Sequence, residues 1–156
     1  MSEADYGEIS DKSKRMAWLL SLSGTLPFLG LAIVLVFAPT DGTYVRSSSS
    51  ALLTYGAIIL SFLGGVRWGV ALTRAEGRSA TQVFVLSVIP ALIGWGAVLL
   101  GQSTGFFILA IAFFAQGVWD YGAWCTDVMQ EWFVKLRMVV SGIVILALFV
   151  AAIASL

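Results

Sequence analysis

Arg67 is the residue of this sequence that most needs a chemical explanation, because it stands inside the apolar stretch YGAIILSFLGGVRWGVAL at residues 55–72. The acid Asp120 is a candidate counter-charge, and the single cysteine, Cys125, follows it closely. The sequence has no histidine, so the commonest general base and metal ligand is missing, and one cysteine cannot form an internal disulfide. It also has no phosphate-binding loop, CxxC pair or dinucleotide fingerprint. We therefore predict no catalytic site, no metal site and no cofactor, and expect Cys125 to be inert.

The composition indicates the environment in which Arg67 lies. The chain has 156 residues, of which 59% are hydrophobic and 12% charged, and its mean hydropathy is +0.93. A soluble domain carries roughly 25% charged residues, so this is a membrane protein whose first partner is the lipid bilayer. The formal net charge of zero argues against nucleic acid as a partner.

Five apolar runs approach the length of about 20 residues that a helix needs to cross the hydrocarbon core. They predict an all-α, five-helix transmembrane bundle that forms one domain over residues 16–156. Residues 1–15 form a polar tail with four acids and three bases. The predicted spans lie at about 16–37, 51–72, 81–100, 105–121 and 136–156.

The distribution of lysine and arginine predicts how the bundle is oriented. Cytoplasmic connections carry an excess of these residues. The side of the amino-terminal tail has seven of them and the opposite side has one: Lys12, Lys14, Arg15, Arg74, Arg78, Lys135 and Arg137 against Arg46. We predict a cytoplasmic amino terminus and an external carboxyl terminus.

Two prolines interrupt predicted spans, Pro27 in the first and Pro90 in the third. A proline inside a helix removes one backbone hydrogen bond and kinks the helix. The hydroxyls of Ser23, Thr25 and Ser87 lie close enough in sequence to help satisfy the freed carbonyl groups. We expect a kink at each proline.

The depth of Arg67 leaves two compatible interpretations. A rise of 1.5 Å per residue places it about 9 Å of helix from Thr73, at the inner end of the second span. It can extend to the inner headgroup region, with Trp68 as an interfacial anchor. Alternatively it pairs with Asp120, which lies at the same depth in the fourth span, and the pair lowers the cost of both charges.

Small residues recur every four positions in the second span: Ala57, Ser61, Gly65 and Gly69. Such a ladder lets another helix approach closely in lipid, where packing drives association. We expect the second span to lie at the centre of the bundle. The helix that packs on the ladder can belong to this chain or to another protein.

The inner end of the fourth span holds a second polar group, with Gln116 deepest and Trp132 and Arg137 beyond it. Gln116 cannot titrate, so the span offers no proton path. From Asp127 on, the acid and base spacing favours an amphipathic helix on the inner membrane surface, with Glu131 four residues before a lysine.

The six tryptophans also allow two interpretations. Trp95 alone lies away from the predicted inner boundary, so it can line a ligand pocket. The other five fit an interfacial aromatic belt: Trp18, Trp68, Trp119, Trp124 and Trp132.

The segments LPFLGLA, LLTYGAIILSFLGGVRWGVAL, SVIPALIGW and EWFVKLR resemble successive signature segments of a family of small bacterial and mitochondrial inner-membrane proteins. That family is catalogued as a domain of unknown function, and its central motif reads YGAxxLSFLGGxxWG. The resemblance covers about residues 18–145. It matches Asp120 to an acid that follows the glutamine at position 116, and Arg137 to the base of a Trp-x-x-x-Leu-Arg pattern. It implies a multi-pass protein of the bacterial or mitochondrial inner membrane and no established reaction.

Two functions of different classes follow from these features. The first is an accessory, structural or assembly subunit of a larger respiratory or photosynthetic membrane complex, with other integral membrane proteins as partners. Its support is the scarcity of catalytic side chains beside many packing features. The alternative is a carrier or binding protein for a small ligand such as a lipid, a porphyrin or a quinone.

Overall fold

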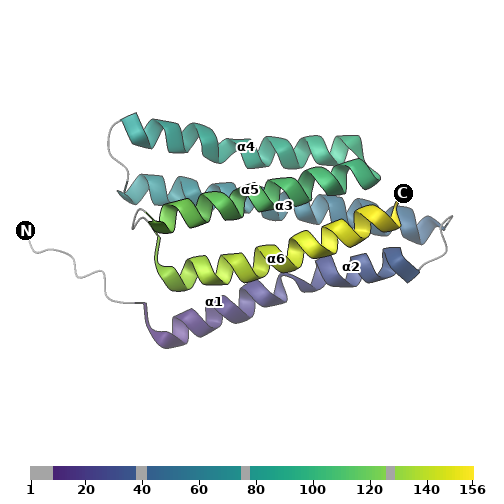
Figure 1. Cartoon of the computed structure of the whole chain (residues 1–156), viewed down its shortest axis with the longest axis horizontal. Helices are drawn as coiled ribbons and strands as arrows, with labels where there is room; N and C mark the ends of the chain where they lie inside the picture. Colours follow the sequence, from purple (N-terminus) through teal and green to yellow (C-terminus); the bar gives the residue numbers. More distant parts are fainter. Residues whose placement is uncertain (1–8, 38–41, 75–77, 126–128) are drawn as a thin grey trace, which may run out of the picture.

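Six α-helices make up the part of the chain that the computed structural model describes, residues 9–37, 42–74, 78–125 and 129–156 (Figure 1). No β-strand occurs within these ranges. The helices are α1 (Asp11–Ser23), α2 (Leu26–Phe37), α3 (Thr43–Arg74), α4 (Arg78–Leu100), α5 (Gln102–Cys125) and α6 (Glu131–Ala154). Taken together, α1 and α2 form one candidate membrane span and each other helix forms another, so the described residues contain five candidate spans, as predicted.

The first span is broken rather than kinked. α1 ends at Ser23 and α2 begins at Leu26, which places Pro27 in the first turn of α2. A backbone N–H in a first turn has no partner within the helix, so proline costs little there. The Thr25 hydroxyl donates to the Leu22 carbonyl at 2.7 Å, and the Gly24 carbonyl accepts from the Tyr55 hydroxyl of α3 at 3.0 Å. The break is therefore tied to the neighbouring span.

Pro90, by contrast, lies inside α4, which continues past it. The Ser87 hydroxyl donates to the Phe84 carbonyl at 2.8 Å. The carbonyl that Pro90 frees is four residues earlier, at Leu86, so Ser87 does not satisfy it as expected. The hydroxyl of a serine in a helix bonds the backbone carbonyl three or four residues earlier in the chain. The Leu86 carbonyl is only one residue before Ser87, so the Ser87 hydroxyl cannot bond it.

Four of the five candidate spans extend clearly beyond the predicted ranges. The first begins at Asp11 instead of near residue 16, so α1 includes the last part of the predicted polar tail. α3 begins at Thr43 instead of near residue 51, because the polar stretch before Ala51 continues the helix although it contributes no hydropathy. α5 continues to Cys125. α6 begins at Glu131, and Glu131 forms an ion pair with Lys135 of 2.6 Å in its first turn. The prediction of a separate amphipathic surface helix is therefore wrong from Glu131 on, because these residues form the first turns of α6. Asp127, where that helix was predicted to begin, lies outside the described residues.

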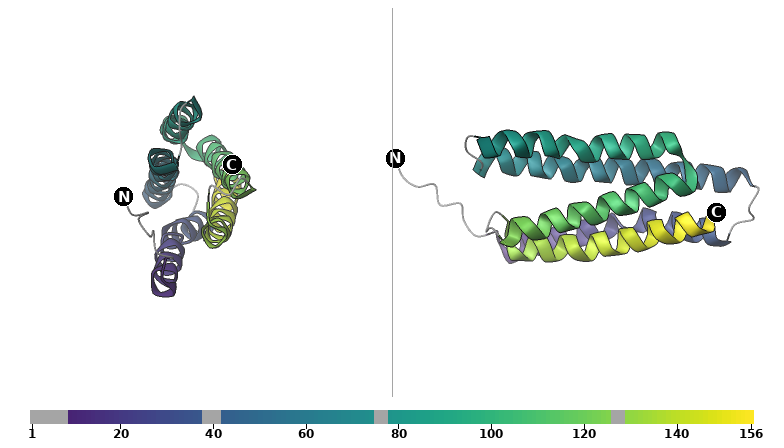
Figure 2. Two further views of the ribbon diagram at one scale, coloured as in Figure 1. Left: turned by 90° about the vertical axis from the view of Figure 1, so that its left-hand side faces the viewer. Right: turned by 45° about the horizontal axis from the view of Figure 1, so that its top comes forward.

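The helices form an elongated bundle in which α1 begins at one end and α6 finishes at the other (Figures 1 and 2). α3 packs most extensively on α4, and α5 on α6, while α2 lies against both α3 and α6. None of the α1 side chains is buried. The core between α2, α3, α5 and α6 is made of large apolar side chains, including Phe28, Leu60, Phe106, Leu109, Phe113 and Leu148.

Candidate functional site

Arg67 and Asp120 meet in the interior of the bundle. Arg67 Nη2 lies 2.6 Å from Asp120 Oδ1, and the two residues are 4% and 2% exposed. The second carboxylate oxygen of Asp120 accepts from Arg137, with Nε at 2.9 Å and Nη2 at 2.7 Å. One aspartate is thus shared by two arginines, and we call Arg67, Asp120 and Arg137 the charge cluster.

The direction of the helices brings these three residues to one level. α3 and α5 both end, and α6 begins, at the end of the bundle where α1 starts (Figure 1). Arg67 precedes the last residue of α3 by seven positions, Asp120 that of α5 by five, and Arg137 follows Glu131 by six. At 1.5 Å per residue, all three lie about 8–11 Å from the helix ends.

The charge cluster joins three helices through groups that are costly to bury separately. Desolvation offsets much of the attraction within a buried ion pair, but removal of one partner typically costs about 3–5 kcal/mol because it leaves an uncompensated charge. The Arg67 guanidinium also lies 4.6 Å from the centre of the Trp119 ring, a cation–π geometry. Trp119 therefore belongs to this site and not only to the aromatic belt.

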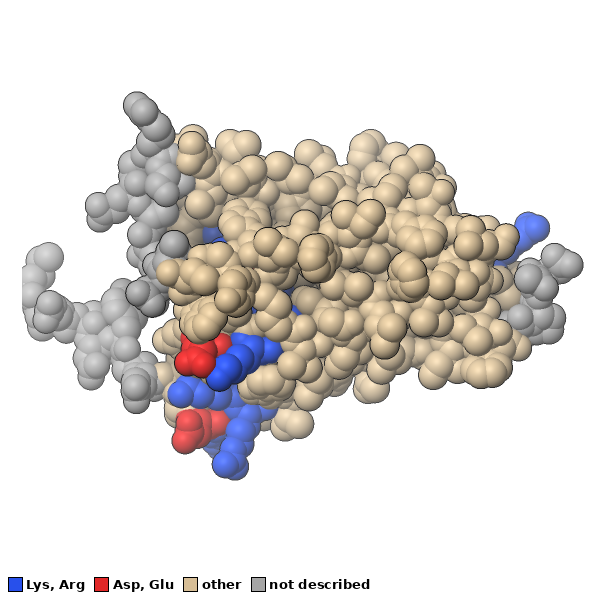
Figure 3. All heavy atoms as spheres, in the orientation of Figure 1, with Lys and Arg blue, Asp and Glu red and all other residues tan. Residues whose placement is uncertain are grey.

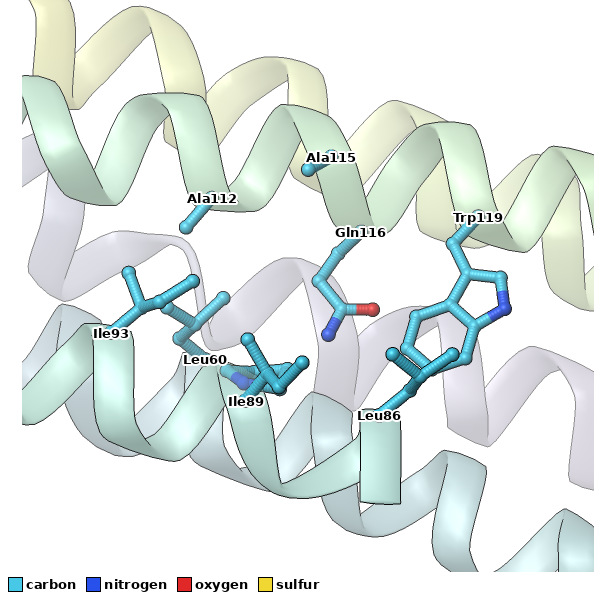
Figure 4. Close-up of a pocket in the computed structure, with 9 residues that line it drawn as sticks. Leu60, Leu86, Ile89, Ile93, Ala112, Ala115, Gln116 and Trp119 are labelled. Carbon is cyan, nitrogen blue, oxygen red and sulfur yellow. The ribbon is translucent and has the colours of Figure 1, made fainter. Parts of the chain in front are cut away.

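A small cavity lies beside the charge cluster, between α3, α4 and α5. It measures about 190 Å³, and its walls are apolar except for Gln116 and the Trp119 indole. Figure 4 shows the Gln116 side chain pointing into it, toward Leu60 and Ile89, with Trp119 at one end. Gln116 is 4% exposed, and its Oε1 has no hydrogen-bond partner among the described residues. Trp95 is 65% exposed and lines none of the three cavities found among the described residues. The interpretation in which Trp95 lines a ligand pocket is therefore wrong for these cavities.

A larger cavity of about 390 Å³ lies between α1, α3 and α6, reaching the first turn of α2. Among the described residues, Arg137 is the one charged residue in its wall, and Ser21 is the one residue with a hydroxyl group. The other residues that line it are Ala17, Leu20, Gly24, Phe28, Ile59, Phe62, Leu63, Val66, Phe133, Leu136, Val140 and Val144. We call this the α1–α6 cavity.

The predicted small-residue ladder divides into a packed part and an exposed part. Ala57 contacts Gly94 of α4, where a Cβ on the glycine would lie 3.1 Å from the Ala57 backbone. Ser61, Gly65 and Gly69 are exposed, and a Cβ on Gly65 would meet no described atom within 4 Å. The close contact with α4 instead uses Gly64, which lies against the Ser87 carbonyl. Within the chain the ladder packs at Ala57, and the other alternative, a helix of another protein that packs on Ser61, Gly65 and Gly69, stays a prediction.

Two of the five predicted interfacial tryptophans, Trp68 and Trp132, lie at the end of the bundle where α1 begins. Trp68 is 44% exposed and packs against Phe84 of α4, with ring centres 4.9 Å apart. The Trp132 indole N–H donates to the Gln130 side chain at 2.6 Å. Cys125 is exposed, and the described residues contain no group of three or more ligand side chains suited to a metal.

Comparison with known proteins places this arrangement in a family. The model of a family described as "Protein of unknown function (DUF3429)" matches residues 13–153, nearly the whole chain. The chain belongs to the DUF3429 family. The match begins within α1 and ends within α6, so the DUF3429 unit includes all five spans and every residue of the charge cluster.

Two vertebrate relatives share this unit. The chain is 30% identical over 134 residues to transmembrane protein 69 of Xenopus tropicalis, covering 85% of this chain and 51% of that protein. It is 29% identical over 91 residues to transmembrane protein 69 of Mus musculus, covering 58% and 36%. The chain thus spans about half the length, or less, of these relatives. No solved structure matches it.

Proposed function

We propose that this DUF3429 protein is a non-catalytic accessory, structural or assembly subunit of a larger respiratory or photosynthetic complex in an inner membrane. The observation that carries the proposal is the exposed part of the ladder on α3, Ser61, Gly65 and Gly69. Small residues that face lipid let a foreign helix approach the backbone closely. α3 also contacts three other spans of the bundle, so a partner bound there would be attached to its centre.

The charge cluster supports a structural role. Its carboxylate accepts from both arginines, so its two oxygens are already engaged and join α3, α5 and α6. An acid used as a general base needs access to the proton that it abstracts, whereas Asp120 is 2% exposed. We further propose that the end holding this cluster faces the cytoplasm or the mitochondrial matrix, as the excess of lysine and arginine there favours.

Blue-native electrophoresis of gently solubilised native membranes, followed by mass spectrometry, tests the proposal. We expect the tagged protein to migrate within a large complex, and a Gly65→Leu variant to migrate separately because its side chain occupies the exposed row. Gly30→Leu is the matched control, since Gly30 of α2 is exposed and has open space at its Cβ position. Migration of the unmodified protein as a monomer or small homo-oligomer would refute the proposal.

A second candidate function is the binding of a small amphipathic ligand. The observation that favours it is the α1–α6 cavity, which combines about 390 Å³ of mostly apolar space with one arginine. For comparison, an apolar cavity of about 150 Å³ is large enough to bind benzene.

A further inference from the structure

The charges around the α1–α6 cavity do not balance among the described residues. Two arginines, of which Arg67 is buried and Arg137 partly buried, share one aspartate, which leaves the charge cluster with one positive charge in excess. Of the next acids along the chain, Glu131 pairs with Lys135 on the surface, and Asp127 lies outside the described residues. Charged side chains within membrane spans are costly and are normally paired, so the excess charge favours binding of an anion.

Arg137 is the group through which an anion can reach this excess charge. Its side chain is 11% exposed, in contrast to 5% for Arg67, and it lines the α1–α6 cavity. Its Nε and Nη2 are engaged by Asp120, whereas no hydrogen bond is assigned to its Nη1 among the described residues. The guanidinium of an arginine that lines a cavity is well suited to bind a phosphate group.

The rest of the cavity is suited to hydrocarbon. Apart from Arg137 and Ser21, every residue of its wall in the described part of the chain is apolar or glycine. On α6 it extends from Phe133 to Val144, about 17 Å at 1.5 Å per residue. It therefore runs along the bundle axis, parallel to the acyl chains of a surrounding bilayer, from the end where α1 begins toward the middle.

The surface beside the cavity carries the matching charge. Lysine and arginine side chains gather at the end where α1 and α6 begin, with two acids among them (Figure 3). Lys12 and Arg15 of α1 are exposed and precede Ala17, the first residue of the cavity wall. Basic pockets between membrane helices on the cytoplasmic or matrix side, the side proposed above for this end of the bundle, bind anionic lipid headgroups.

We infer that the α1–α6 cavity binds one anionic phospholipid, with an acyl chain between α1, α3 and α6 and its phosphate on Arg137. This inference rests on the second candidate function and names its ligand. The lipid supplies the negative charge that the charge cluster lacks. It also covers apolar side chains of α3 and α6 that α1, which buries none of its own residues, leaves open.

Native mass spectrometry of the delipidated full chain tests the inference by titration with phosphatidylglycerol or phosphatidylcholine of identical acyl chains. We expect the first phosphatidylglycerol to bind at least tenfold more tightly. Arg137→Gln should reduce that preference to less than threefold, while leaving the neutral Arg67–Asp120 pair to hold the fold. Arg137→Lys keeps the charge and should retain the preference. The matched control is Arg46→Gln, the same change at an exposed site at the opposite end of the bundle.

A second variant tests where the acyl chain lies. Ser21→Phe places a large side chain in the cavity without removing charge, and it should lower the affinity for both lipids at least fivefold.

Equal affinity of the unmodified protein for the two lipids, or an unchanged preference for phosphatidylglycerol in Arg137→Gln, would overturn the inference. So would displacement of the lipid by 10 mM inorganic phosphate, which would identify a site for a soluble anion. Binding of neither lipid, and of no quinone or porphyrin, would also reject the second candidate function. The blue-native test of the first function is unaffected by any of these results.

Discussion

At the scale of single residues, Asp120 holds the most constrained position in the protein. It provides the one carboxylate of the charge cluster, and each of its oxygens is used by a different arginine. Loss of either arginine leaves a neutral pair, whereas loss of Asp120 leaves two positive charges close together, one buried and one partly buried, without a counter-charge in the cluster. The effects of substitutions at these three positions should therefore be strongly unequal.

We predict that Asp120→Asn destabilises the bundle by about 3–5 kcal/mol, and that Arg137→Gln costs clearly less. In a double-mutant cycle, Arg67→Gln and Asp120→Asn should show a coupling energy of about 1–3 kcal/mol. Unfolding in detergent micelles, followed by circular dichroism, measures each free energy. A coupling below about 0.5 kcal/mol would mean that the Arg67–Asp120 contact contributes little to stability.

At the scale of helices, the geometry of the α-helix explains why the ladder divides. Residues four apart are separated by about 400° of rotation, so each step turns the row by about 40° around the helix. Over the three steps from Ala57 to Gly69 the row turns from α4 toward the lipid. Residues seven apart drift by only about 20° in the opposite sense, which explains why Ala57 and Gly64 both face α4.

This difference predicts opposite results for two adjacent glycines. Gly64→Leu should destabilise the isolated protein by about 1–3 kcal/mol or more, because the leucine side chain would overlap the Ser87 backbone of α4. Gly65→Leu should change stability by less than about 0.5 kcal/mol, because its Cβ position is open. Thermal unfolding of both variants in the same detergent distinguishes them. Equal losses would show that α3 is rotated relative to the structure described above.

At the scale of the whole molecule, an odd number of candidate spans predicts that Asp11, where the first span begins, and Ala154, where the last one ends, lie on opposite sides of the membrane. The lone cysteine provides a natural reporter, since Cys125 is exposed at the end of α5, where α1 also begins. We predict that a membrane-impermeant maleimide labels Cys125 in inside-out vesicles and not in right-side-out vesicles.

A Cys125→Ser, Thr43→Cys variant is the control, because Thr43 begins α3 at the opposite end and should show the reverse pattern. Labelling of Cys125 in right-side-out vesicles alone would reverse the proposed orientation.

Much of this organisation could be predicted from the sequence, because hydropathy over about 20 residues determines which segments can cross a bilayer. The pairing of Arg67 with Asp120 could also be predicted, since the predicted second and fourth spans place both residues near the same end of the bundle. The contact between Asp120 and Arg137 could not be predicted, because the last span was expected to start near residue 136 and Arg137 therefore to lie at the membrane interface. α6 begins at Glu131, so Arg137 lies almost two turns inside. Hydropathy does not detect that polar first turn, and the cavity depends on how α1 packs, which no local pattern specifies.

The shared carboxylate has a consequence for how the family evolves. Because one acid is shared by two bases, position 120 cannot lose its charge by a single substitution without leaving the two arginines side by side with no acid between them. A change at position 67 or 137 is tolerated more easily, since it leaves a neutral pair. Related sequences that lack an acid at position 120 are therefore expected to lack at least one of the two arginines. The order of historical replacement is predicted as well: a base is lost first, and the acid only afterwards.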